Sequence, residues 1–199
     1  MKPLISILVF LLTLPLFPIK KDSLAITVGA GFRLVTEDSF KDIFGSTNPV
    51  FSLDICLELK KNIALFLHTD YFSAKGETSS LKDQVSWRLI PVEVGGRYFF
   101  GDKIRFFGGL GGGIYLYKEE VTFSDTTSET SGSQAGFFGE LGSRIPISKT
   151  IFVSISAKYH LLTIKPKKKS DSDGDSTIYY NQNQSLAGFS ILAGIGILI

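Results

Sequence analysis

The sequence predicts an all-β fold: a closed, antiparallel, eight-stranded transmembrane β-barrel with long extracellular loops and short periplasmic turns. Three observations lead to this prediction. Eight segments alternate between apolar and polar residues with period two, the connections between them are alternately long and short, and nearly every segment has one apolar face. The 199-residue chain is 44% hydrophobic with a net charge of +2, which argues against a disordered chain and against a nucleic-acid-binding protein.

The first residues of the chain predict export. Lys2 is followed by an apolar run from Leu4 to Phe17, which matches a secretory signal peptide and is shorter than the roughly 20 residues that a helix needs to span a bilayer. We therefore expect residues 1–22 to be a signal peptide, with a poorly marked cleavage site, and residues 23–199 to form the barrel domain. A short uncleaved membrane anchor is the alternative.

Eight segments after residue 23 are the expected strands. Most have the roughly 10 residues that a tilted strand needs to cross a membrane, and no convincing stretch has the apolar spacing of a helix. Pro91 lacks a ladder donor inside one segment, so we expect a bulge or a strand start there. The expected strands are Leu24–Thr36, Val50–Leu59, Ile63–Ala74, Trp87–Phe100, Ile104–Lys118, Ala135–Ile145, Ile151–Leu162 and Leu186–Ile199.

The connections between these strands alternate in length. Long loops on one side and tight turns on the other are typical of outer-membrane barrels, and an even strand number places both ends of the barrel on the periplasmic side. The long, polar connections are 37–49, 75–86, 119–134 and 163–185, and the short ones are 60–62, 101–103 and 146–150.

Each expected strand has an apolar face and a mixed face. The five cations of the mixed face would together cost about 10–20 kcal/mol if that face met lipid, at about 2–4 kcal/mol each near the midplane. A whole domain is stable by only about 5–15 kcal/mol. The apolar face should therefore meet lipid. The charged residues of the mixed face, expected to pair as a network in the lumen, are Arg33, Asp54, Glu58, Asp70, Glu93, Arg97, Arg105, Glu140, Arg144 and Lys158.

The expected lumen is narrow. Eight strands enclose only enough room for side chains, so a wide aqueous pore is not expected. Inward glycines such as Gly109, Gly111 and Gly113 could leave a gap, which neighbouring aromatic side chains either fill or leave open. A narrow passage is therefore kept as an alternative.

Several motifs resemble those of a known family. They are Ile90-Pro91-Val92, the GGRYFF run at 95–100, the turn at 101–103, the glycine-rich strand at 105–113 and the amphipathic C-terminal strand. They resemble the small eight-stranded bacterial outer-membrane β-barrel proteins, the group around the OmpA barrel, OmpW and the opacity-like proteins. The resemblance implies a location in the bacterial outer membrane, contact with outer-membrane lipid and insertion by the barrel-insertion machinery. We also expect a monomer.

The longest loop contains a run of lysines and a run of acids. Clustered lysines near a membrane can contact lipid phosphates, although a solvated loop is an equal alternative. The acidic DSDGDS segment at 171–176 departs from the calcium-binding loop pattern, so no metal site is predicted. The lysines in question are Lys165, Lys167, Lys168 and Lys169.

No catalytic residue or cofactor is predicted. His68 and Asp70 share one face and His160 lies near the outer end of its strand, but no nucleophile elbow, paired-histidine metal motif or phosphate loop accompanies them. We expect a non-enzymatic protein with a structural or surface-loop interaction role, its partner unknown. One alternative is a narrow channel for small solutes, including apolar solutes that enter laterally, as the resemblance to OmpW-like proteins suggests. Another is a soluble lipocalin-like barrel with its faces inverted.

Overall fold

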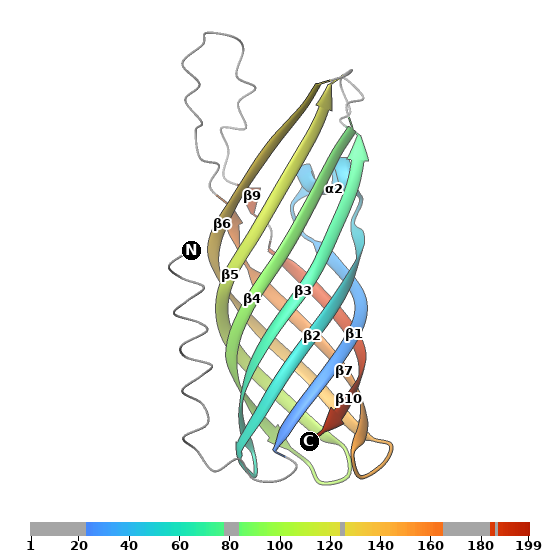
Figure 1. Ribbon diagram of the computed structural model, residues 1–199, viewed down its shortest axis with the longest axis vertical. Helices are drawn as coiled ribbons and strands as arrows, with labels where there is room; N and C mark the ends of the chain where they lie inside the picture. The colour runs from blue at the N-terminus through green and yellow to red at the C-terminus, as the bar shows by residue number, and fades with distance from the viewer. Residues whose placement is uncertain (1–22, 78–83, 124–125, 165–183, 186) are drawn as a thin grey trace.

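The computed structural model describes residues 23–77, 84–123, 126–164, 184–185 and 187–199, so the expected signal peptide lies outside it. Eight long strands form a tilted barrel, with one short helix and a two-stranded ribbon at one end (Figure 1). The elements are β1 (Leu24–Val35), α2 (Asp38–Phe44), β2 (Thr47–Lys60), β3 (Ile63–Glu77), β4 (Gln84–Phe100), β5 (Arg105–Phe123), β6 (Thr126–Pro146), β7 (Ile151–Leu161), β8 (Thr163–Ile164), β9 (Gln184–Ser185) and β10 (Gly188–Leu198).

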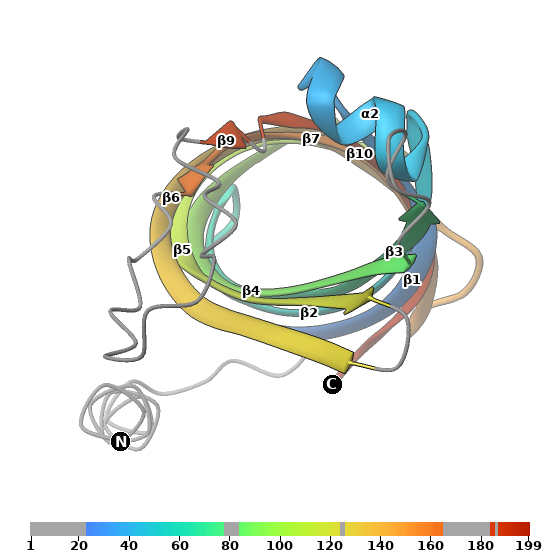
Figure 2. The same ribbon diagram turned by 90° about the horizontal axis from the view of Figure 1, so that it is seen from above.

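The sheet has no open edge within the barrel wall. The strands follow the order β1-β10-β7-β6-β5-β4-β3-β2, every pair is antiparallel, and β1 joins β10 to complete the ring seen from above in Figure 2. Such closure is what hydrocarbon requires, because an unpaired backbone donor or acceptor costs several kcal/mol there. The predicted fold class is confirmed.

The long connections contain more regular structure than the sequence predicts. The expected loop at 119–134 is largely a hairpin, because β5 and β6 remain paired up to Phe123 and Thr126. Its residues are rich in threonine and serine and lack an apolar face. β-Branched residues favour strands. A strand with water on both faces does not need the alternation of apolar and polar residues that identified the other strands in the sequence.

A short helix contradicts the prediction that no helix follows residue 23. α2 occupies the expected loop at 37–49 and ends at Gly45, whose backbone N–H donates to the Lys41 carbonyl at a positive φ of 77°. Phe40 and Phe44 stand four residues apart and therefore share one face, with ring centroids 4.5 Å apart. Seven residues are too few for a periodicity signal. Within the described part of the chain, no helix is long and apolar enough to cross a membrane.

Pro91 causes neither a bulge nor a strand start, and that prediction is wrong. β4 continues through it, and the register with β3 is the same on both sides, with Thr69 opposite Val92 and Phe72 opposite Leu89. Pairing is interrupted only between these positions. The hydroxyl of Thr69 donates to the Pro91 carbonyl at 2.8 Å, so a side chain satisfies this acceptor where the backbone ladder is interrupted.

The barrel turns its apolar face outward. Val94, Leu110 and Phe137 are 55%, 75% and 70% exposed, whereas Glu93 and Lys158 on the other face are fully buried. Aromatic pairs mark the two ends of the apolar belt, Phe100 against Phe106 near the short turns and Tyr159 against Phe189 toward the other end. This arrangement excludes the barrel with inverted faces.

Placing a cation on the outward face should destabilise the barrel only where that face meets lipid. We expect Val94→Arg to lower the free energy of unfolding in lipid vesicles by about 2–4 kcal/mol. Gln84→Arg, on the same strand and face but beyond the apolar belt, should change it by less than about 0.5 kcal/mol. Denaturant titration of the two variants measures the difference, and equal effects would show that hydrocarbon does not surround Val94.

Candidate functional site

The charged side chains of the lumen form three groups along the barrel. The group nearest the short turns centres on Glu58, whose carboxylate accepts hydrogen bonds from Arg105 at 2.7 and 2.9 Å and from Arg144 at 3.3 Å. Arg105 is only partly buried. This group therefore closes the periplasmic end with ion pairs that still touch water.

The middle group is built on Arg97 of β4, whose guanidinium reaches two opposite walls. It donates to both oxygens of Asp54 on β2, at 2.6 and 2.8 Å, and to Glu140 on β6 through Nε and Nη2. Its planar group also lies 3.9 Å from the centre of the Phe66 ring. One guanidinium thus joins two buried carboxylates and an aromatic face, which a lysine ammonium could not do with the same geometry.

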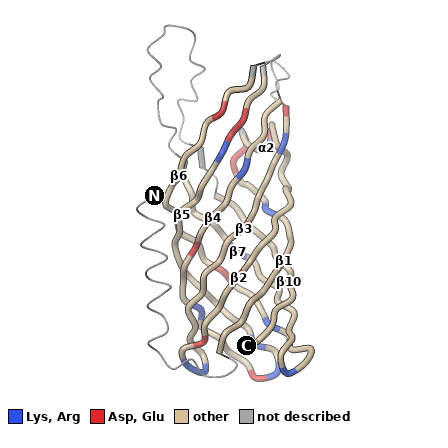
Figure 3. Tube along the Cα trace, in the orientation of Figure 1, with Lys and Arg blue, Asp and Glu red and all other residues tan. Residues whose placement is uncertain are grey.

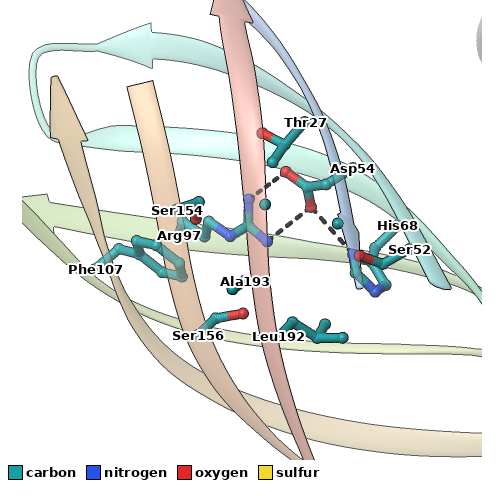
Figure 4. A pocket seen from close by; sticks show the side chains of 12 residues that line it. Thr27, Ser52, Asp54, His68, Arg97, Phe107, Ser154, Ser156, Leu192 and Ala193 are labelled. Carbon is teal, nitrogen blue, oxygen red and sulfur yellow. Dashed lines mark hydrogen bonds and ion pairs between the residues drawn. The ribbon is translucent and has the colours of Figure 1, made fainter. Parts of the chain in front are cut away.

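His68 extends the middle group toward the outer end. Its Nδ1 lies 3.3 Å from Asp54, the contact drawn in Figure 4. Its Nε2 lies 2.7 Å from Asp70. A continuous chain of polar contacts therefore runs from Glu140 through Arg97 and Asp54 to Asp70. A cavity of about 30 Å³ adjoins this chain, lined in part by Thr27, Ser52, Ser154 and Ser156. It has room for only a few water molecules.

The third group centres on Glu93, which is fully buried. Lys158 and the Tyr115 hydroxyl each donate to it at 2.6 Å. Arg33, also buried, places its guanidinium 5.6 Å from the centre of the Phe72 ring. The ten charged residues of the predicted network therefore lie on the lumen side. Ion pairs there involve Asp54, Glu58, Asp70, Glu93, Arg97, Arg105, Glu140, Arg144 and Lys158.

The Glu93 group contains a carboxylate, an imidazole and a hydroxyl in the order that acyl-transfer enzymes use. His160 lies 3.2 Å from Glu93 through Nδ1 and 3.2 Å from the Ser190 hydroxyl through Nε2. All three side chains are fully buried, and Tyr115 donates to the same Glu93 oxygen. A nucleophile must reach a substrate, and in this structure all three side chains are enclosed.

Aromatic side chains fill the spaces beside the inward glycines. A Cβ on Gly111 would lie 2.6 Å from the Phe138 ring, and one on Gly136 would lie 2.7 Å from the Tyr115 ring. Phe138 also belongs to a buried cluster in the periplasmic half of the lumen, with Phe66, Phe99, Phe107 and Phe152. The space beside Gly111 is therefore filled by a ring, whereas the space beside Gly109 is filled by the side chains of Glu140 and Arg97.

At the outer mouth, the structure brings together aromatic residues that the sequence did not predict to be neighbours. Phe40 of α2 packs on Phe72 at 6.2 Å and on Trp87 at 5.9 Å, between ring centroids. Figure 2 shows α2 at the rim of the barrel, above these strands. The only signal in the sequence was the four-residue spacing of Phe40 and Phe44 in a segment that otherwise looks like a loop. Lys165, Lys167, Lys168 and Lys169, predicted to contact lipid phosphates, lie outside the described residues.

The upper parts of β3, β4, β5 and β6 form a four-stranded sheet beyond the apolar belt, which we call the outer sheet. It comprises 73–77, 84–88, 117–123 and 126–136. Figure 3 shows basic and acidic positions following one another along it. α2 covers the β3 edge so closely that a Cβ on Gly76 would clash with the Ile43 carbonyl. At the opposite edge, the β6–β7 ladder begins only at Phe137, so no described strand pairs with residues 126–136 there.

Comparison with known proteins agrees with this architecture. Residues 7–191 match a family model described as an outer membrane protein beta-barrel domain. Neisserial surface protein A and OprG of Pseudomonas aeruginosa each superpose with a TM-score of 0.60 at 12% identity, covering 89% and 90% of this chain and 97% of theirs. Ail of Yersinia pestis, solved with the heparin analogue sucrose octasulfate, gives 0.57 at 13% identity, covering 88% and 97%. No curated protein sequence matches the chain.

Removing the guanidinium of Arg97 from the lumen should lower the free energy of unfolding far more than removing a guanidinium from the surface. Arg97→Met leaves Asp54 and Glu140 buried without their cation, and we expect a loss of about 3–5 kcal/mol in the free energy of unfolding. Arg88, whose exposed side chain lies 3.7 Å from Glu120, is the matched control, and Arg88→Met should cost at most about 1 kcal/mol. Urea titration of the refolded proteins tests this. A loss for Arg97→Met no larger than the control's would mean that the buried network does not stabilise the barrel.

Proposed function

The chain belongs to the outer membrane protein beta-barrel family and lies in the bacterial outer membrane, and from this premise we propose that it is a non-enzymatic surface protein that acts by contact through the outer sheet. The filled lumen carries this proposal. Ion pairs, aromatic rings and the α2 side chains occupy its length, and the small cavity beside Arg97 has room for only a few waters. A protein without an aqueous path is left with its external surfaces.

The β6 edge of the outer sheet is the surface best suited to contact. A strand edge with unpaired backbone donors and acceptors is a template for another extended chain. Proteins that avoid such pairing place lysine or proline on the edge. Residues 126–136 read TTSETSGSQAG, with neither. Because α2 covers the opposite edge, pairing is available on one side only, and we infer a partner that offers an extended polypeptide segment.

An added strand should protect the amides of this edge from hydrogen exchange. As a probe we choose a synthetic peptide with the sequence of Tyr117–Phe123. This segment of β5 already pairs with β6 on the side of β6 that faces away from the open edge. We expect saturable slowing of exchange, at least tenfold, at amides within 126–136, because those facing the open edge gain hydrogen bonds. The same peptide with proline at alternate positions is the control. Exchange unchanged at every one of these amides would contradict the proposal.

A second candidate function is a lateral route for small apolar solutes. Two observations favour it: the pairing between β3 and β4 is interrupted at Pro91, and on the outer side of that point the buried side chains of Phe72, Trp87 and Leu89 line the lumen. Movement of these side chains would connect the outer mouth with the lipid through the weakened ladder. This route needs no aqueous pore, so it is compatible with a filled lumen at rest.

Flux measurements separate the two candidates. We expect no conductance steps from purified protein in planar bilayers and no accelerated uptake of an apolar fluorescent dye into vesicles, because the lumen is filled. Uptake that is faster than in empty vesicles, and that is lost when a disulfide joins Tyr71→Cys to Ile90→Cys across the interruption, would favour the lateral route. Reproducible conductance steps abolished by Gly111→Val would instead favour a channel through the lumen.

A further inference from the structure

Charged side chains on the outward face of the outer sheet form ion pairs, whereas the carboxylate on its inward face has no such partner among the described residues. On the outward face, Lys118 bonds to Glu120 at 2.9 Å and to Glu129 at 2.8 Å, and Arg88 lies near the same Glu120. Glu120 and Glu129 are directly opposite each other, so the lysine relieves a like-charge pair. The inward face of the described sheet carries one carboxylate, Glu119, and every charged neighbour named above points away from it.

Glu119 is surrounded by uncharged side chains. It stands opposite Trp87 on β4 and opposite Thr130 on β6, and Tyr117 shares its face one step toward the barrel. Val121 and Val85 form the next inward pair on the other side. Within the described part of the chain, no ion pair or hydrogen bond reaches the Glu119 carboxylate. Among the described residues, it is therefore a partly buried anion without a cation.

The electrostatics of the two adjacent glutamates confirm this contrast. The hydrogen bond from Lys118 holds the pKa of Glu120 below its usual value, whereas burial raises the pKa of Glu119. Burial and the charge of Glu119 together raise the pKa of Tyr117, so the carboxylate acts directly on the phenol beside it. A cation placed between them would relieve both effects.

Two aromatic rings complete the surroundings of Glu119. Trp87 and Tyr117 are stacked, with centroids 6.1 Å apart and planes 3° from parallel. Trp87 is buried beneath Phe40, while Tyr117 is only partly buried. Gly132 faces Tyr117 and has no side chain, and a Cβ there would lie 2.5 Å from the tyrosine hydroxyl. The phenol ring thus lies over the β6 backbone with Trp87 beside it.

We propose that the inward face of the outer sheet binds a small organic cation, whose ammonium or guanidinium group contacts the Glu119 carboxylate and the Tyr117 ring. Small organic cations are attracted both by the face of an aromatic ring and by a desolvated carboxylate, and this site offers both groups. A hard metal ion is a poorer ligand, because it requires several oxygen ligands and only the Thr130 hydroxyl stands beside this carboxylate. The site lies on the face of the sheet and not on the β6 edge, so it is independent of the proposed contact function.

The single tryptophan of the chain makes this site directly measurable. We would titrate the full-length protein, in non-ionic detergent, with tetramethylammonium chloride and follow Trp87 fluorescence, with sodium chloride at the same ionic strength as reference. We expect a saturable change with tetramethylammonium only. Glu119→Gln should weaken the apparent affinity at least tenfold, and Tyr117→Leu should weaken it several-fold, because each removes one of the two attractions.

The matched control is Glu120→Gln, one residue away on the opposite face, which should leave the affinity within twofold of the unmodified protein. A heat-dependent gel shift verifies that each variant forms the barrel. Equal affinities for Glu119→Gln and Glu120→Gln would overturn the proposal, as would an identical response to sodium chloride or the absence of any saturable response in the unmodified protein. Failure of any of these kinds would leave peptide protection at the β6 edge unaffected.

Discussion

Pairing of every polar group inside the wall is the constraint on which the rest of this structure depends. Hydrocarbon offers no hydrogen bonds, so the β1–β10 ladder must close the ring and charged side chains must point inward. Once inward, they are too crowded to remain separate. Arg97, held between Asp54 and Glu140, shows the result: one guanidinium joins opposite walls and neutralises two carboxylates. The interior of the barrel is therefore a packed core of ion pairs and aromatic rings.

The same constraint explains why the glycines and aromatics of the lumen occur together. A narrow ring has no room for a side chain at every inward position, so a large ring such as that of Phe138 lies over Gly111. The interruption at Pro91 is the one place in the described β3–β4 ladder where backbone pairing fails, and the Thr69 hydroxyl compensates there. That tolerance makes this part of the wall the weakest and gives the lateral route its physical basis.

Beyond the apolar belt, polar groups no longer need partners within the barrel, and the outward face of the strands becomes polar. β5 and β6 continue as polar strands, α2 covers one edge, and charges on the outward face pair in water. Because the outer sheet does not need to neutralise every group internally, it can keep an edge at residues 126–136 that no described strand pairs, and a carboxylate at Glu119 that no described residue neutralises. Unsatisfied groups of this kind are available to partners, which is why both proposals concern the outer sheet.

The sequence by itself determined the strand number, the inward and outward faces and the charged residues of the lumen, because a period-two pattern such as Ile26, Val28 and Phe32 is local and survives without tertiary information. It missed α2 and the β5–β6 extension, whose residues are stabilised by packing and pairing and not by an apolar face. Only the tertiary structure decided that Phe40 meets Trp87, that Phe138 fills the space at Gly111, and that Glu119 is left without a cation while Glu120 has one. These outcomes depend on register and on contacts between distant segments, which no local pattern encodes.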